Sequence, residues 1–354
     1  MRPFLERLAR GADLTRRDAQ TAMEAIMEGV VDDAQIAAFV MALRMKGETP
    51  DEIAGCALAL RSRGQTIAPA ARQARSLVDT CGTGGDALGT INVSTLSALV
   101  AAGAGLPVAK HGNRSVSSLC GSADLLEALG LPIDLPPDDV KGCLDRTGLA
   151  FLYAPRFHPA LRHAAGVRRS LGMRTIFNLL GPLSNPAGAR RQLLGVYDAS
   201  RLRAMASVLR MLGARRALLV HGHDGMDELT VTGPTAVVEL KDGTIRSKTW
   251  TPEMAGLRRW RLAALQGGDP ERNAAAALSV LEGGPGAARD VTLLNAGAAL
   301  LVGGAASTLK EGVALARESI DTGRARAKLE EVRVFCVAAQ SARHPGAAPI
   351  EPAP

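Results

Sequence analysis

Residues 76–102 read SLVDTCGTGGDALGTINVSTLSALVAA, and this stretch decides the class of fold. Ser76–Thr80 has the apolar character of a short strand. The glycine-rich turn Cys81–Asp86 follows, and the apolar run Ser94–Ala104 then has the spacing of a helix. A strand, a glycine turn and a helix in this order predict the beginning of an α/β unit.

Further apolar stretches extend this unit toward the C-terminus. Leu106–Lys110, Ala217–His221 and Ala236–Leu240 are typical of strands, and Ser200–Gly213 is typical of a helix. We therefore predict an α/β fold in which helices flank a central mixed sheet.

The N-terminal part follows a helical pattern instead. Apolar residues recur at helical spacing from Thr15 to about Arg63, and Thr49-Pro50-Asp51-Glu52 has the cap, the proline and the acidic first turn of a helix start. Gly64–Arg75 is interpreted as a connection. We predict a small helical domain over residues 1–70, joined by helices near residues 165–185. An α/β domain over 71–340 and a disordered Pro/Ala-rich tail over 341–354 complete the chain.

Composition favours an enzyme over a nucleic-acid-binding protein. The 354 residues are 47% hydrophobic, which allows a large core. The net charge is +7, but only seven of the 42 basic residues are Lys, and no block of five basic residues occurs. Aromatic residues that could stack on bases make up 3%. Nucleic acid is therefore a disfavoured partner, and a local site for an anionic substrate explains the charge equally well.

Cysteine spacing and the lack of long apolar runs limit the cellular context. The five cysteines show no C-x-x-C spacing, which argues against a disulfide framework or a zinc site and predicts free thiols. The N-terminus has no apolar signal segment, and no uninterrupted run of about 18 apolar residues occurs. We expect a cytoplasmic protein without membrane contact.

Two motifs have the composition of phosphate sites. In Cys81–Asp86, followed by Thr90–Thr95 at the predicted helix start, glycines can turn backbone N–H groups toward an anion. This motif lacks the Lys of a P-loop, and alone it fits a structural turn equally well. Lys110–Ser118 (KHGNRSVSS), with Gly121 and Ser122 behind it, places two cations and several hydroxyls in a short loop. Its alternative is a solvated polar loop.

Two later motifs carry carboxylates and arginines. His221–Leu229 (HGHDGMDEL) contains Asp227 and Glu228, whose oxygens suit Mg²⁺, although an Asp-Glu pair alone is more often a solvated turn. Its two histidines lack a third ligand for zinc. Arg168 precedes Arg174–Pro186 (RTIFNLLGPLSNP) and could bind a carboxylate in bidentate fashion, although an isolated Arg is more often a surface residue.

The four motifs in this order resemble the anthranilate phosphoribosyltransferase family of tryptophan biosynthesis, and the similarity extends from Thr15 to about Val334. The resemblance implies a homodimer of the nucleoside phosphorylase and phosphoribosyltransferase-like architecture. In it, a small helical domain and a larger α/β domain form a cleft that binds phosphoribosyl pyrophosphate, anthranilate and Mg²⁺.

The resemblance also implies the roles of individual residues. Lys110, Arg168 and Asn113 match catalytic positions. The positions that match anthranilate-binding residues are Gly82, His111, Asn113 and Arg168, and those that match Mg²⁺ ligands are Ser94, Asp227 and Glu228. The positions that match residues binding phosphoribosyl pyrophosphate are Gly82, Gly85, Asp86, Thr90, Asn92, Val93, Ser94, Thr95, Lys110, His111, Gly112, Asn113, Arg114, Ser115, Val116, Ser117, Ser118 and Ser122.

Four positions depart from the family pattern: Ala87 (often Gly), Ile91 (often Phe), Leu119 (often Lys) and Cys120 (often Ser). None of these changes removes a charge that the chemistry requires. We expect Ile91 and Leu119 to alter loop closure or substrate affinity while the type of reaction is kept.

The implied chemistry needs no strong base, because the neutral amine of anthranilate carries its own lone pair. Stabilising the departing pyrophosphate is the harder task, which predicts catalysis by electrostatics and positioning. Two alternatives remain: a pyrimidine-nucleoside phosphorylase, which uses inorganic phosphate and a nucleoside, and a non-catalytic relative that binds nucleic acid.

Overall fold

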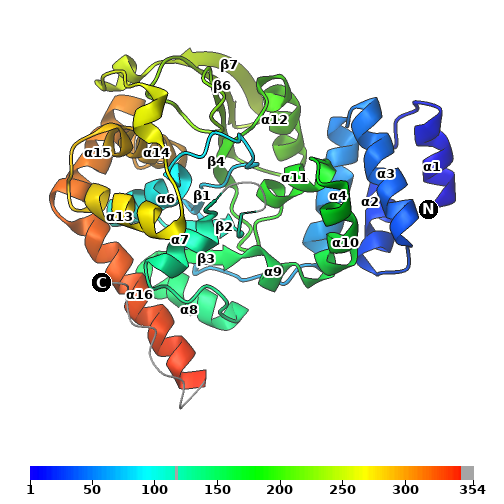
Figure 1. Ribbon diagram of the computed structural model, residues 1–354, viewed down its shortest axis with the longest axis horizontal. Helices are drawn as coiled ribbons and strands as arrows, with labels where there is room; N and C mark the ends of the chain where they lie inside the picture. Colours follow the sequence, from blue (N-terminus) through cyan, green and yellow to red (C-terminus); the bar gives the residue numbers. More distant parts are fainter. Residues whose placement is uncertain (116–118, 344–354) are drawn as a thin grey trace.

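Residues 1–115 and 119–343 are described by the computed structural model of the chain. Its N-terminal helices are α1 (Arg2–Ala9), α2 (Arg16–Met27), α3 (Asp33–Lys46) and α4 (Pro50–Arg63). Thr49 caps α4 as predicted, because its side chain accepts from the Glu52 N–H while the Glu52 carboxylate accepts from the Thr49 N–H. Figure 1 shows this helical unit in blue, beside the rest of the molecule.

The centre of the molecule is a mixed sheet, as predicted, and the structure gives it seven strands. Its strand order is β3-β2-β1-β4-β5-β6-β7. The first five strands in this order are parallel neighbours, β6 pairs with β5 in antiparallel fashion, and β7 pairs with β6 in antiparallel fashion. The strands are β1 (Val78–Asp79), β2 (Val108–Gly112), β3 (Leu149–Tyr153), β4 (Arg191–Gly195), β5 (Arg216–Gly222), β6 (Thr235–Lys241) and β7 (Thr244–Trp250).

Helices flank this sheet in the remaining sequence, except that α10 (Arg162–Leu171) packs against α2 and α3 of the N-terminal unit. They are α5 (Ala71–Ala74), α6 (Val93–Gly103), α7 (Ser122–Ala128), α8 (Pro137–Thr147), α9 (Ala154–Phe157), α10 (Arg162–Leu171), α11 (Ile176–Leu180), α12 (Leu202–Met211), α13 (Pro270–Leu281), α14 (Ala287–Gly303), α15 (Leu309–Asp321) and α16 (Arg324–Arg343).

The two faces of the sheet belong to two separate apolar clusters. Successive strand residues alternate between them: Leu193 and Leu218 pack with α6 and α14, whereas Leu194 and Leu219 pack with α11 and α12. The second cluster also contains the interior of α2, α3 and α4. The N-terminal helices therefore share a core with one face of the sheet, through α10, α11 and α12 (Figure 1).

The sequence prediction missed several elements and placed the start of the C-terminal tail too early. The strands β3, β4 and β7 were not predicted; β7 is largely exposed and polar, so it lacks the alternating pattern of a half-buried strand. The connection before β1 contains the short helix α5. The predicted tail begins too early, because α16 continues through residues 341–343 and Arg343 pairs with Asp139 on α8. The other residues of that tail, 344–354, lie outside the described residues.

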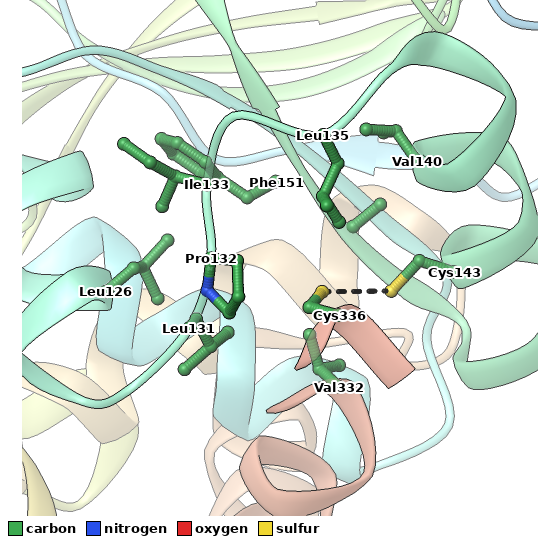
Figure 2. A pocket seen from close by; sticks show the side chains of 11 residues that line it. Leu126, Leu131, Pro132, Ile133, Leu135, Val140, Cys143, Phe151, Val332 and Cys336 are labelled. Carbon is green, nitrogen blue, oxygen red and sulfur yellow. Dashed lines mark hydrogen bonds between the residues drawn. The ribbon is translucent and has the colours of Figure 1, made fainter. Parts of the chain in front are cut away.

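The five cysteines are buried, and none of them forms a disulfide in the part of the chain that the structure describes. Figure 2 shows the closest pair, Cys143 on α8 and Cys336 on α16, whose sulfur atoms are 4.0 Å apart. Their side chains line an apolar cavity of about 20 Å³ together with Leu135 and Val332. This small gap lies where the last helix packs against α8.

Close packing of α2 on α4 yields a stability prediction. A Cβ added at Gly55 would lie 2.2 Å from the Arg16 carbonyl oxygen and 2.9 Å from the Gln20 nitrogen. We expect Gly55→Ala to lower the free energy of unfolding by about 1–3 kcal/mol, because the helices must separate. Urea unfolding measures this change.

Gly166→Ala on α10 is the matched control, because the nearest atom to its added Cβ is 3.9 Å away. There we expect a gain of about 0.5–1 kcal/mol from lower backbone entropy in the unfolded chain. Equal unfolding free energies for the two variants would contradict the close helix contact.

Candidate active site

The candidate site lies at the carboxyl edge of the parallel strands. There β2 and β4 pair with opposite sides of β1, which makes this edge the switch point at which open α/β sheets bind ligands. The loop after β1 reaches across it: Gly82 forms a bridge with Gly195 at the end of β4, and the Gly84 N–H donates to Asp227 Oδ2 over 2.9 Å.

Glycine is required in this loop for both conformation and space. Gly84 and Gly85 have φ of +68° and +80°, which side chains other than glycine rarely adopt. A Cβ at Gly82 would lie 2.9 Å from Asp227 Oδ2, and one at Gly195 would lie only 1.6 Å from the Asp227 carbonyl oxygen. The Asp227 segment can therefore approach these two strand ends only because they carry no side chain.

Ala87, where the family often has glycine, has an unusual backbone conformation. Its φ is 61°, so it occupies the left-handed region in which glycine is preferred. The usual glycine at this position fits that conformation without strain, whereas alanine stores about 1–2 kcal/mol. This strain is confined to the loop that carries Asp86.

Lys110 is the central buried cation of the site. Its Nζ donates to the Thr80 carbonyl oxygen over 2.9 Å and to Ser94 Oγ over 3.1 Å. Burial lowers the pKa of Lys110, while the carboxylates of Asp79, Glu228 and Asp227 act in the opposite direction. Strand β2 thus directs an ammonium group at the end of β1 and the first turn of α6.

Asp227 and Glu228 bring concentrated negative charge to the same place. Burial and then the nearby Asp86 raise the pKa of Asp227 to about 7. Burial and then Asp227 raise the pKa of Glu228 well above its usual value, although a hydrogen bond from the Ser94 N–H opposes this change. Like charges are held close together here, and a bound cation would reduce the repulsion between them.

The three predicted metal positions therefore meet. Ser94 contacts both Lys110 and Glu228, and Asp227 adjoins Glu228. Their hydroxyl and carboxylate oxygens are the donors that Mg²⁺ takes, usually beside waters or substrate phosphates. A group of three or more His, Cys, Asp or Glu side chains able to hold a metal does not occur among the described residues.

His111 and Asn113 lie just beyond Lys110. The backbone N–H of His111 donates to Asp79 Oδ1 over 3.2 Å. The ring atom Nδ1 of His111 lies 3.0 Å from the Gly181 carbonyl oxygen. Burial lowers the pKa of His111 to about 3, so the ring is neutral, and its Nε2 has no hydrogen-bond partner in the described part of the chain. The Asn113 carbonyl oxygen accepts from Ser122 Oγ over 3.1 Å.

Arg114 and Ser115 of this polar loop face α7. The Arg114 guanidinium pairs with Asp124 and Glu127, and the Ser115 N–H donates to Asp124 Oδ2. The side chain of Arg114 is thus engaged by acidic groups, and its predicted role in substrate binding stays a prediction. Val116, Ser117 and Ser118 lie outside the described residues.

Arg168 lies on α10, over the ring of Phe177. Its Cζ is 5.4 Å from the centroid of the Phe177 ring, and burial lowers its pKa. Across residues 1–115 and 119–343, it makes no hydrogen bond or ion pair with the glycine loop. No direct polar contact therefore links Arg168 to the glycine loop in the described part of the chain, and its role in binding anthranilate stays a prediction.

Two residues that the sequence motifs did not single out hold this site together. Asp79 is fully buried at the end of β1, where it accepts from the His111 N–H and the Cys81 thiol. Asn273 on α13 donates to Asn92 Oδ1 over 2.9 Å. A charge inside an apolar strand could have revealed Asp79, but no local pattern marks Asn273.

The chain matches the glycosyl transferase family in both its helical bundle domain (residues 2–64) and its a/b domain (residues 74–326). The anthranilate phosphoribosyltransferase of Moorella thermoacetica is 56% identical over 326 residues, which cover 92% of this chain and 95% of that protein. The anthranilate phosphoribosyltransferase of Symbiobacterium thermophilum is 52% identical over 336 residues, which cover 95% of this chain and 97% of that protein.

Solved structures of anthranilate phosphoribosyltransferases have the same fold as this chain. The anthranilate phosphoribosyltransferase of Thermus thermophilus superposes with a TM-score of 0.89 at 46% identity and covers 94% of this chain and 99% of its own. The Saccharomyces cerevisiae enzyme in complex with phosphoribosyl pyrophosphate and Mg superposes with a TM-score of 0.86 at 28% identity, covering 96% and 97%. None of the helices in the described ranges is long and apolar enough to cross a membrane. The chain belongs to the anthranilate phosphoribosyltransferase family, as the four motifs predicted.

Proposed function

We propose that this protein transfers the phosphoribosyl group of phosphoribosyl pyrophosphate to the amine of anthranilate, with release of pyrophosphate, in tryptophan biosynthesis. One observation carries the proposal: Lys110, Ser94 and the Asp227-Glu228 pair meet beside the glycine loop at the switch point. A buried ammonium next to two carboxylates suits a polyanionic donor that binds together with a divalent cation.

The donor end of the site stabilises negative charge. As the bond between ribose C1 and pyrophosphate breaks, charge grows on the departing oxygens. Lys110 is positioned to stabilise that charge, because its ammonium group is held in place before the reaction begins. The glycine loop can add backbone N–H groups other than those of Thr83 and Gly84, which already donate to Gly195 and Asp227.

A magnesium ion fits Ser94, Asp227 and Glu228. Burial first, and the neighbouring carboxylates second, raise the pKa values of both groups, and a bound cation would favour their charged forms. When bound, the ion would supply positive charge to the pyrophosphate. The Mg present with the donor in the Saccharomyces cerevisiae enzyme supports this assignment.

The acceptor end positions a neutral nucleophile. We assign the anthranilate carboxylate to Arg168, whose guanidinium suits bidentate binding, and the ring to Asn113 and the neutral His111. Fixing the amine near the ribose carbon makes the encounter effectively intramolecular. The proton that the amine loses needs no strong base, since the amine attacks in its neutral form.

We also propose that two copies of the chain associate, as the family resemblance implies. Val30, in the connection between α2 and α3, and Met45, near the end of α3, are strongly exposed apolar side chains and offer surface for that contact. Sedimentation velocity tests the proposal, because a species at the chain mass of 36.8 kDa at all concentrations would contradict it.

The reaction itself gives the first prediction. We expect anthranilate fluorescence to decay when the purified protein meets phosphoribosyl pyrophosphate and Mg²⁺, and excess chelator to stop the decay. Phosphorolysis of uridine or thymidine without anthranilate turnover would instead support the pyrimidine-nucleoside phosphorylase alternative.

Arg168→Ala tests the acceptor assignment. We expect the KM for anthranilate to rise by about 10- to 100-fold while the KM for the donor stays within about twofold, because a charge-assisted hydrogen bond contributes about 1.5–3 kcal/mol. Steady-state kinetics with each substrate varied in turn measures both constants. Arg169→Ala is the matched control, since that neighbour on α10 is exposed. An unchanged anthranilate KM in Arg168→Ala would refute the assignment.

The double variant Asp227→Asn with Glu228→Gln tests the metal assignment. We expect Mg²⁺ to raise the melting temperature of the wild type but not of the variant, because neutral amides bind hard cations weakly. Without Mg²⁺ we expect the variant to melt no lower than the wild type, since it lacks the repulsion between the two acids. Equal stabilisation of both proteins by Mg²⁺ would exclude these carboxylates as ligands.

A further inference from the structure

Arg174 lies beside the glycine loop although it belongs to a different part of the chain. It occupies the turn between α10 and α11, and its guanidinium stacks on the Tyr197 ring, with Cζ 4.2 Å from the ring centroid. Its carbonyl oxygen accepts a 2.6 Å hydrogen bond from Arg44 on α3. The residue therefore lies where the N-terminal helices meet the sheet domain.

The guanidinium occupies the space above Gly85. A Cβ built on Gly85 would lie 2.9 Å from Arg174 Nη2 and 3.0 Å from Nε. The absence of a side chain at Gly85, in addition to its positive φ, thus leaves room for a cation directly over the loop. The fifth residue of the GTGGD motif, Asp86, and the neighbouring Asp227 complete its electrostatic surroundings.

The hydrogen-bonding capacity of this guanidinium is unused. Within the described ranges it donates no hydrogen bond and forms no ion pair shorter than 4.0 Å, although it acts on Asp227 through space. A guanidinium has five N–H donors in a planar fork that matches phosphate oxygens. Stacking on Tyr197 keeps that fork oriented while its N–H groups remain available for a ligand.

We propose that Arg174 binds the pyrophosphate group of the phosphoribosyl donor, as a binding residue beyond Lys110 and the glycine loop. This inference rests on the proposed function, since it names one more contact for the same donor. Arg174 approaches the loop from the side of α3 and α11, whereas Lys110 approaches from β2. The pyrophosphate would then be held between two cations that come from different parts of the fold.

Tyr197 is the positioning residue for this contact. Its backbone N–H donates to Thr83 Oγ1 over 3.0 Å, which ties the ring to the same glycine loop. Arg201 lies on the ring as well, 5.9 Å from its centroid, and pairs with Glu48 after α3. The ring alone supplies the stacking surface, so Tyr197→Phe should preserve the position of Arg174, whereas Tyr197→Leu should not.

Binding of inorganic pyrophosphate in the presence of Mg²⁺, measured by calorimetry, tests the proposal without turnover. We expect Arg174→Ala to weaken pyrophosphate binding and to raise the donor KM by about tenfold or more, with the anthranilate KM within about twofold. Arg174→Lys should recover part of the loss, because a point charge replaces the fork. Tyr197→Leu should resemble Arg174→Ala, and Tyr197→Phe should resemble the wild type.

Arg169→Ala, which removes an exposed arginine of the same region, should leave pyrophosphate binding unchanged. Unchanged pyrophosphate affinity in Arg174→Ala would overturn the proposal, and so would a loss confined to thermal stability. A wild type that binds pyrophosphate but does not consume anthranilate would instead contradict the proposed function, while the comparison of Arg174 variants would still decide this inference.

Discussion

The burial of the Lys110 ammonium is the constraint on which the site depends. A charged group taken out of water is costly unless polar partners surround it. Here the partners are the Thr80 carbonyl oxygen, Ser94 Oγ and the charge of Asp79, which come from β1 and the first turn of α6. The ends of β1 and β2 and the start of α6 must therefore keep fixed positions relative to one another. The same ammonium offsets part of the repulsion between the carboxylates that lie beyond it.

The second requirement is the absence of side chains at a few positions. Asp227 reaches the glycine loop only because Gly195 and Gly82 leave room for its backbone and carboxylate, and Arg174 covers the loop only because Gly85 does. Charge and space are linked in this way: opposite and like charges from four segments converge where three glycines permit close approach. Ala87 is an exception in this loop, because it carries a side chain although its φ is positive, and this conformation is strained.

Much of the fold could be predicted from local patterns, and the exceptions have physical causes. Long apolar runs such as those of β5 and β6 and the capped helix α4 were predicted because burial and capping leave signatures in adjacent residues. The strand β7 escaped prediction because an exposed edge strand buries almost nothing. The short strand β4 begins with Arg191 and Gln192, whose polarity conceals a position in the middle of the sheet.

The sequence by itself determined the class of fold, the family and the polar side chains of its four motifs, because these depend on residues that are neighbours in the chain. Only the tertiary structure decided that Asp227 lies against Gly82, that Asn273 holds Asn92, and that Arg174 covers Gly85. These partners are separated by about ninety to one hundred and eighty positions. Strand order and loop closure bring them together, and no local pattern of polarity encodes which loops will meet at one edge of a sheet.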